Sequence, residues 1–392
     1  MIGDAIEALL AAGVAARVFP VARAVVRHQG AVAVDVGAGA AADTAFDLAS
    51  LTKVMATTAV FLSCWAEGKV EPATPVARWW PESPVGRDGV TLADLLTHRA
   101  GLPAFEPFFA GAMRESSALL SPACPPALRE ATRRLVVERA LATPLEAPPR
   151  TRAVYSDVGF LVLGQALIEA GGAALDALFV ERVARPLGLS ARFRRLSAAT
   201  GTAPAIPPGP PPIAPTGSAR PREPAPGQKG RWPPIPPAAS SPGEVDDDNA
   251  WVMDGVAGHA GLFGAAADVA AFGQAVLDEV DGAGRIAPAA LWAEALARDV
   301  STPGSTRAFG FDTRHPADAG GDLSTGRFLG RLPPGAVGHL GFTGVSLWVD
   351  LGLRLVVALC TNRTALGRAE TRIRDFRPHF HDAVVRALGL AG

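Results

Sequence analysis

A serine and a lysine three residues apart are the first residues in this chain whose types and spacing could do chemistry. Ser50-Leu51-Thr52-Lys53 opens a long apolar run. Serine is a weak nucleophile at neutral pH and needs a base within hydrogen-bond reach. Residues three apart on a helix share one face, so Lys53 can reach the Ser50 hydroxyl. The pattern indicates acyl transfer through a serine.

The single tyrosine of the chain, Tyr155, supplies a candidate third member, in the tripeptide Tyr155-Ser156-Asp157. Ser-x-x-Lys alone is also typical of a helix N-cap serine followed by an exposed lysine. Lys53, however, lies in a largely apolar segment, where an unpaired ammonium would be costly. We therefore expect Lys53 to have a buried partner.

The bulk composition favours a globular protein that acts on small molecules. The chain has 392 residues, 48% of them hydrophobic, which allows a sizeable core in two or three domains or in one domain with a large insertion. Lys and Arg total 37 against 38 for Asp and Glu, a net charge of -1. That balance gives no electrostatic footprint for nucleic acid or an anionic membrane, so we expect a small acyl substrate as the partner.

Cysteine usage and the N-terminal segment bear on cofactors and location. Cys64, Cys124 and Cys360 are far apart and form no Cys-x-x-Cys pair, so we expect reduced core thiols, no metal and no cofactor. The first residues lack the positive start of a secretory signal. The longest apolar run, residues 54–66, is too short to span a bilayer. A cytoplasmic protein without a membrane anchor is the resulting expectation.

Strand patterns cluster at both ends of the chain, where we also expect a helix at each end. The sequence predicts helices over 4–14 and 369–388 and two hairpins, formed by 21–28 with 31–36 and by 345–349 with 354–360. We expect a break or kink in the last helix at Pro378, and a solvated face carrying Arg372, Arg374 and Arg377. The two ends should pair into one sheet.

Helical patterns dominate the middle of the chain. The ranges concerned are 50–67, 91–97, 127–142, 157–170, 174–184, 266–277 and 288–297. Residues 201–242 hold 15 of the 35 prolines, a composition typical of a long extended loop or of a flexible linker between domains. We predict a sheet domain made of 1–85 and 300–392, with 86–299 as a helical insertion that contains this loop.

Five segments together resemble the serine β-lactamase and penicillin-binding-protein superfamily, specifically its class C-like branch of esterases, D-amino-acid peptidases and β-lactamases. They are 46–53 (FDLASLTK), 95–103 (LLTHRAGLP), 155–159 (YSDVG), 258–263 (GHAGLF) and 338–344 (GHLGFTG). The resemblance implies an α/β (α+β) fold of the β-lactamase/transpeptidase type, with an antiparallel sheet formed by both chain ends and flanked by helices.

The resemblance also implies roles for particular residues. Ser50 would attack an acyl carbon to form an acyl-enzyme, while Lys53 and Tyr155 share the proton transfers. The backbone N–H groups of Ser50 and Phe342 would form the oxyanion hole, which requires the Phe342 segment to be held rigidly against Ser50. Gly341 would allow the close approach of the two segments.

Two departures from the family pattern concern the substrate and the base. A Lys-Thr-Gly motif is common in β-lactamases and peptidases, but here it reads His339-Leu340-Gly341, which predicts weak carboxylate recognition and a preference for simple esters. Asp157 stands where many relatives carry Asn. If its carboxylate reaches Lys53, it favours the ammonium, which would depress the pKa of Tyr155 and make tyrosinate the base. Alternatively, Asp157 caps the helix that follows.

Other polar residues have simpler interpretations. His98 should end a helix and bond locally, without a catalytic role. His259 could line the pocket; a metal pair of His259 and His339 would lack further ligands at suitable spacing. Residues 246–248, three consecutive aspartates, are typical of a solvated loop or helix cap.

These observations favour a metal-independent serine hydrolase acting on carboxylic esters. Three alternatives stay open from sequence: a β-lactamase or D-amino-acid peptidase or carboxypeptidase, an acyltransferase that uses the same residues, and a non-catalytic acyl-binding or sensor module.

Overall fold

The computed structural model describes residues 2–121, 124–197, 212–226, 238–241, 243–315 and 324–391. Much of the proline-rich segment 201–242 lies outside the described residues. Most of its described residues belong to no helix or strand, but it includes one short pairing, β5 (Ala219–Arg220) with β6 (Ala238–Ala239). At this pair the segment therefore departs from the extended loop or flexible linker that its composition predicts.

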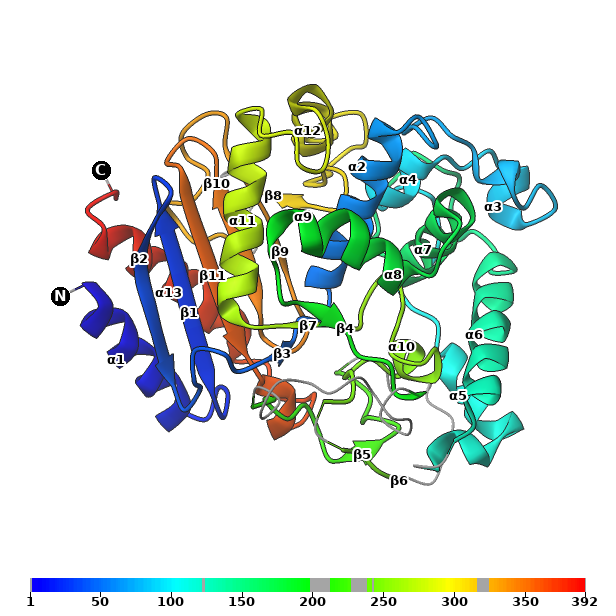
Figure 1. Ribbon diagram of the computed structural model, residues 1–392, viewed down its shortest axis with the longest axis horizontal. Helices are drawn as coiled ribbons and strands as arrows, with labels where there is room; N and C mark the ends of the chain where they lie inside the picture. The colour runs from blue at the N-terminus through cyan, green and yellow to red at the C-terminus, as the bar shows by residue number, and fades with distance from the viewer. Residues whose placement is uncertain are drawn as a thin grey trace.

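A six-stranded antiparallel sheet joins the two ends of the chain, as predicted (Figure 1). Its order is β2-β1-β11-β10-β9-β8, with bounds Ala31–Ala38, Ala22–His28, Leu355–Thr361, Ser346–Asp350, Ala336–Leu340 and Asp312–Thr313. β1 pairs with β11 over its whole length. Both expected hairpins are confirmed, and they lie next to each other in the sheet.

Helices cover both faces of this sheet. α1 (Ile2–Ala15) and α13 (Ile373–Ala387) pack on one face and α11 (Ala266–Val280) on the other (Figure 1). β11 is buried along its whole length, which suits its continuous apolar sequence LVVALCT. β2, at the edge, has several exposed positions.

The last helix differs from its prediction in two ways. α13 begins at Ile373 and runs without a break through Pro378 to Ala387. Arg372 and Arg374 are exposed, but Arg377 is only 6% exposed, so its assignment to a solvated face is wrong. The Arg377 guanidinium donates hydrogen bonds to backbone carbonyls of the turn between β9 and β10. These contacts explain its burial, because a buried guanidinium needs acceptors.

The remaining helices form a layer beside the sheet (Figure 1). The longer ones are α5 (Phe108–Glu115), α6 (Pro126–Leu141), α7 (Asp157–Gly171) and α12 (Ala289–Leu296), and the short ones α3 (Pro84–Arg87), α4 (Leu92–Leu96), α8 (Leu175–Phe179), α9 (Arg185–Leu187) and α10 (Asp248–Val252). A small sheet of order β3-β7-β4 joins Phe46–Asp47, Leu262–Gly264 and Arg192–Phe193. The domain boundaries at residues 85 and 300 stay a prediction.

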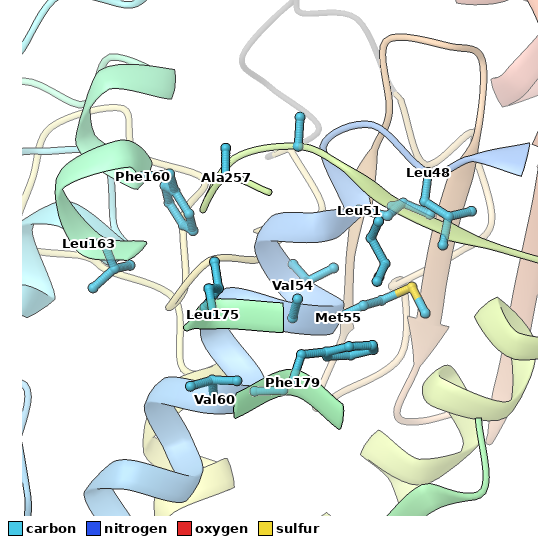
Figure 2. Packing of buried hydrophobic residues seen from close by; sticks show 14 of the residues in the cluster. Leu48, Leu51, Val54, Met55, Val60, Phe160, Leu163, Leu175, Phe179 and Ala257 are labelled. Carbon is cyan, nitrogen blue, oxygen red and sulfur yellow. The ribbon is translucent and has the colours of Figure 1, made fainter. Parts of the chain in front are cut away.

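The segment after Ser50 lies at the centre of the largest core. A wide π-helical segment, η1 (Lys53–Thr58), leads into α2 (Ala59–Ala66), where we expected one regular helix. Its apolar side chains pack between α7, α8 and the segment that carries Ala257 (Figure 2). The packing on all sides agrees with the apolar pattern of this run, and it holds Lys53 among buried groups. The three cysteines are also buried and unpaired.

Within the described ranges, no single helix is both long and apolar enough to cross a membrane. One bent pair, α7 with residues 175–187, meets the length and composition criteria only when its two parts are taken together across a 74° bend.

Gly273 sets how closely α11 approaches the sheet. A Cβ atom added there would lie 2.9 Å from Leu347 Cδ1 and closer still to Val356 Cγ1. We expect Gly273→Ala to lower the free energy of unfolding by roughly 1 to 2 kcal/mol, because the clash outweighs the gain in helix propensity. Chemical denaturation measures this change.

Gly3 in α1 is the matched control, since an added Cβ would be 3.6 Å from its nearest neighbour, Val36 Cγ1. Gly3→Ala should leave stability unchanged or raise it. Equal effects of the two substitutions would show that α11 does not need the close approach.

Candidate active site

A pocket of about 360 Å³ opens where the large sheet, the Ser50 segment and the helical layer meet. Seven residues singled out from sequence line it: Ser50, Tyr155, Asp157, His259, His339, Gly341 and Phe342. They come from segments that are up to 292 positions apart (342 minus 50) in the chain. Lys53 lies beneath them and is fully buried.

The turn before Ser50 is held in an unusual backbone conformation. Ala49 has φ 46°, a left-handed conformation that a residue with a Cβ seldom adopts. The Asp47 carboxylate accepts the Ala49 N–H at 2.8 Å and so stabilises this turn. Burial raises the pKa of Asp47 to about 7, with the Asp246 charge adding to the rise. The turn places Ser50 in the wall of the pocket.

Lys53 is the buried charge on which the site is built. Its Nζ donates to Ser50 Oγ at 3.2 Å, to Asp157 Oδ1 at 2.7 Å and to the His259 carbonyl at 3.2 Å. Burial alone would lower the pKa of Lys53, but the Asp157 carboxylate and Tyr155 outweigh it and raise the pKa above its ordinary value. Lys53 is therefore an ammonium in this structure.

Tyr155 lies with its phenol oxygen buried and in interaction range of Lys53 and Ser50. Lys53 lowers the pKa of the phenol, as expected, but burial and the Asp157 charge raise it, and the net direction is upward. The predicted net depression of the Tyr155 pKa is therefore wrong for this state of the protein. The Lys53 and Tyr155 pair holds both of its protons at neutral pH.

Asp157 makes the contact with Lys53 that one of its two interpretations required, and His98 differs in part from its prediction. Ser156, not Asp157, caps α7, since its hydroxyl accepts the Gly159 N–H at 3.0 Å. This leaves the Asp157 carboxylate free for Lys53. His98 does follow the end of α4, but its ring reaches beyond its own segment, because its Nδ1 accepts the Ser156 N–H at 3.0 Å and its ring packs on Tyr155. His98 thus supports the Tyr155 segment.

The two backbone N–H groups predicted to bind an oxyanion are both free. Within the described part of the chain, neither Ser50 N–H nor Phe342 N–H donates a hydrogen bond, and both residues line the pocket. The expected close approach at Gly341 is present: an added Cβ would lie 3.0 Å from the Leu48 carbonyl and 3.3 Å from Ala49 Cβ. Free donors in a pocket wall can bind a developing negative charge.

His339 is a neutral side chain in the pocket. Burial, with the charges of Lys53 and Arg307, holds the pKa of His339 well below its usual value. Its Nδ1–H donates to the Leu340 carbonyl at 2.8 Å, while the buried Nε2 has no hydrogen-bond partner among the described residues. His339 therefore supplies an acceptor and no positive charge.

The aspartates at 246–248 are not a solvated loop. Asp247 is the N-cap of α10, as one interpretation predicted, and its Oδ1 also lies 2.8 Å from His259 Nε2. Asp246 and Asp248 are 3% and 2% exposed. They pair with arginines, Asp248 with Arg220 at 2.7 Å. These pairs anchor the described part of the proline-rich segment beside the pocket.

We find no candidate metal centre. Among the described residues, no group of three or more His, Cys, Asp or Glu side chains is placed to hold a metal ion. His259 and His339 are each engaged with other partners, Asp247 and the Leu340 carbonyl.

Sequence reasoning missed the arginines that line the pocket. They are Arg307, Arg363, Arg368, Arg374 and Arg377. The Arg307 guanidinium lies 5.2 Å from the centre of the Tyr155 ring and 3.4 Å from Asp312, its ion-pair partner. No short motif marks these residues, because their positions depend on contacts between distant segments.

Comparisons with known proteins agree with this architecture. A family model described as Beta-lactamase matches residues 6–377. A protein of Escherichia coli (strain K12) named "Putative D-alanyl-D-alanine carboxypeptidase" is 28% identical over 351 residues, which is 86% of this chain and 73% of that protein. The N-acetylmuramyl-L-alanine amidase of Bacillus subtilis (strain 168) is 26% identical over 348 residues, covering 82% of this chain and 68% of that protein.

Solved structures confirm the predicted β-lactamase/transpeptidase-like fold. The octameric penicillin-binding protein homologue from Pyrococcus abyssi has a TM-score of 0.67 at 17% identity, over 98% of this chain and 77% of that one. The D-amino acid amidase from Ochrobactrum anthropi SV3 has a TM-score of 0.64 at 19% identity, over 99% of this chain and 98% of that one. EstCE1, a hydrolase with promiscuous acyltransferase activity, has a TM-score of 0.63 at 22% identity, over 96% of this chain and 98% of that one.

The effect of the Asp157 charge should be measurable as a shift in the pKa of Tyr155, because Tyr155 is the only tyrosine of the chain. Asp157 raises the pKa of both Lys53 and Tyr155. We therefore expect Asp157→Asn to lower the titration midpoint of Tyr155, by roughly 1 to 3 pH units. Tyrosinate absorbance measures the midpoint, with circular dichroism showing that the protein stays folded.

Asp281→Asn is the control, since Asp281 is an exposed partner of Arg354 at the surface. It should leave the midpoint unchanged. An unchanged midpoint in Asp157→Asn as well would mean that Asp157 does not control the proton affinity of the site.

Proposed function

This chain belongs to the beta-lactamase family of serine hydrolases, and we propose that it hydrolyses simple carboxylic esters through an acyl-enzyme on Ser50. One observation carries the proposal: the Lys53 ammonium donates to Ser50 Oγ, and the N–H groups of Ser50 and Phe342, which both line this pocket, have no acceptor among the described residues. The pocket thus brings together a nucleophile (Ser50), a charged group that can take part in proton transfer (Lys53) and two donors that can bind an oxyanion.

Proton transfer in this proposal uses Lys53 and Tyr155 as a unit. The pair holds both protons in the resting state, so it must lose one before it can accept the Ser50 proton. Ser50 Oγ then bonds to the acyl carbon, and its proton passes to Tyr155. When the tetrahedral intermediate collapses, the leaving group takes this proton. Water repeats the sequence and releases the acid.

The proposed preference for esters follows from the substrate groups that His339 and Phe342 can bind. His339 is neutral and offers only an acceptor at the position of the lysine in the Lys-Thr-Gly motif that is common in β-lactamases and peptidases. An ester needs no cation for binding, and its alcohol leaves more readily than an amine. Phe342, 40% exposed in the pocket wall, offers an apolar surface for the acyl group.

We expect a fluorophosphonate to add once to the wild-type protein and not to Ser50→Ala, because only an activated serine reacts with it. Intact-protein mass spectrometry gives the adduct count. The wild type should also turn over p-nitrophenyl acetate faster than nitrocefin, and Ser50→Ala should lose at least about a thousandfold in rate.

Absence of both adduct and turnover in a folded protein would favour a non-catalytic acyl-binding module instead. Faster turnover of nitrocefin would replace ester hydrolysis by β-lactam hydrolysis while leaving the acyl-enzyme in place.

A second candidate function is hydrolysis of substrates that carry a carboxylate, as peptidases of D-amino acids do. Arg307 favours it: its guanidinium lies in the pocket beside Tyr155, with Asp312 at 3.4 Å as its ion-pair partner. In the described residues no hydrogen bond from this guanidinium is found, so its planar donor fork can take a carboxylate.

The two candidates differ in what Arg307→Ala does. If a carboxylate binds there, kcat/KM for nitrocefin, which carries one, should fall about 10- to 100-fold, while p-nitrophenyl acetate is unaffected. Arg307→Lys should recover part of the loss. Equal effects on both substrates would count against a carboxylate site at Arg307.

A further inference from the structure

The turn between β9 and β10 carries one of the two proposed oxyanion donors. We call residues 341–344 the oxyanion loop. Its Phe342 N–H belongs to the same peptide unit as the Gly341 carbonyl. A trans peptide is planar and its C=O and N–H point in opposite directions, so whatever fixes this carbonyl also fixes the direction of the N–H.

Arg377 fixes that carbonyl from α13. Its Nη2 donates to the Gly341 carbonyl and its Nε donates to the Gly344 carbonyl at 3.3 Å. The Gly341 carbonyl also accepts the Gly344 N–H at 3.1 Å, which closes the turn. With the carbonyl held towards Arg377, the Phe342 N–H points away from this side chain and is left without an acceptor among the described residues.

Arg363 holds the next two peptide units of the loop. Its Nε donates to the Phe342 carbonyl at 2.7 Å and its backbone N–H donates to the Thr343 carbonyl at 2.9 Å. Its guanidinium lies 4.3 Å from the centre of the Phe342 ring. Both carbonyls are therefore fixed, and the loop cannot rotate a peptide unit without breaking a hydrogen bond to an arginine.

The loop is also tied to the Ser50 turn. Thr343 Oγ1 donates to the Asp47 carbonyl at 2.7 Å, and the Asp47 carboxylate accepts the Ala49 N–H. Asp47 thus connects the segment of one oxyanion donor to that of the other. Arg377 and Arg363 set the orientation of the loop, and Asp47 sets its distance from Ser50.

We propose that Arg377, assisted by Arg363, is a positioning residue that holds the Phe342 N–H in the direction required to bind the oxyanion. The proposal rests on the acyl-enzyme function proposed above. Its support is geometric: Arg377 is 6% exposed, and its guanidinium donates to two carbonyls of the oxyanion loop, one of them in the same peptide unit as the Phe342 N–H.

We expect Arg377→Met to lower kcat for an oxoester by about 100- to 1,000-fold, the effect of losing one oxyanion donor, with little change in KM. Arg377→Lys should lie between Arg377→Met and the wild type, because an ammonium reaches fewer carbonyls than a guanidinium fork. Rates are expressed per active site, counted by the amount of fluorophosphonate bound, so that unfolded protein is not included.

The deciding measurement is the ratio of kcat/KM for an oxoester to that for the matching thionoester. Sulfur accepts hydrogen bonds weakly, so an oxyanion hole accelerates the oxoester far more than the thionoester. In Arg377→Met this ratio should fall below the wild-type ratio, towards the ratio of the uncatalysed hydrolysis rates of the two esters. Arg386→Met, at an exposed position of the same helix, should keep the wild-type ratio.

Three results overturn the proposal. If Arg377→Met lowers thermal stability but keeps the wild-type ratio, Arg377 has a purely structural role. If both Arg377 variants keep the wild-type kcat, the carbonyl contacts do not matter. If the wild type itself shows no preference for the oxoester, there is no oxyanion hole to position, and the proposed acyl-enzyme mechanism fails with it.

Discussion

One buried ammonium group organises the centre of this protein. Lys53 has no solvent exposure, and its charge is tolerable only because Asp157, Ser50 and the His259 carbonyl surround it. These partners come from three separate segments, so compensating the charge also assembles the site. Leaving a buried charge unpaired costs about 3 to 5 kcal/mol, so removing the partner of Lys53 should destabilise the fold as well as the site. Chemistry and folding therefore depend on the same contacts.

The parts of the site that follow from sequence are those that lie close together in the chain. Ser50 and Lys53, and Tyr155 with Asp157, are short patterns whose spacing fixes a shared location on one element. The hairpins at the two ends follow from alternation and turn residues, and their pairing into one sheet follows from the clustering of strand patterns at both ends of the chain. A buried partner for Lys53 was expected, since an ammonium in an apolar segment needs one, and the structure identifies this partner as Asp157.

Two kinds of feature could not be predicted from the sequence. They are contacts between residues far apart in the chain, and pKa shifts set by effects that oppose each other. Arg377 reads as one of several basic residues on a helix, and only its contact with Gly341 distinguishes it. Asp247 and Ser156 each stand beside residues that cap equally well. The direction of the Tyr155 pKa required knowing that burial outweighs Lys53, and burial is a property of the folded chain.

The arginine contacts of the oxyanion loop have a consequence for the order in which a ribosome makes this protein. Ser50, Lys53 and Tyr155 all lie in the first half of the chain, but α13, which holds Gly341 through Arg377, is made after every other part of the site. A nascent chain that has folded its helical layer would hold a nucleophile without an oriented oxyanion donor. Reactivity would thus appear only after α13 has been made and has docked on the sheet.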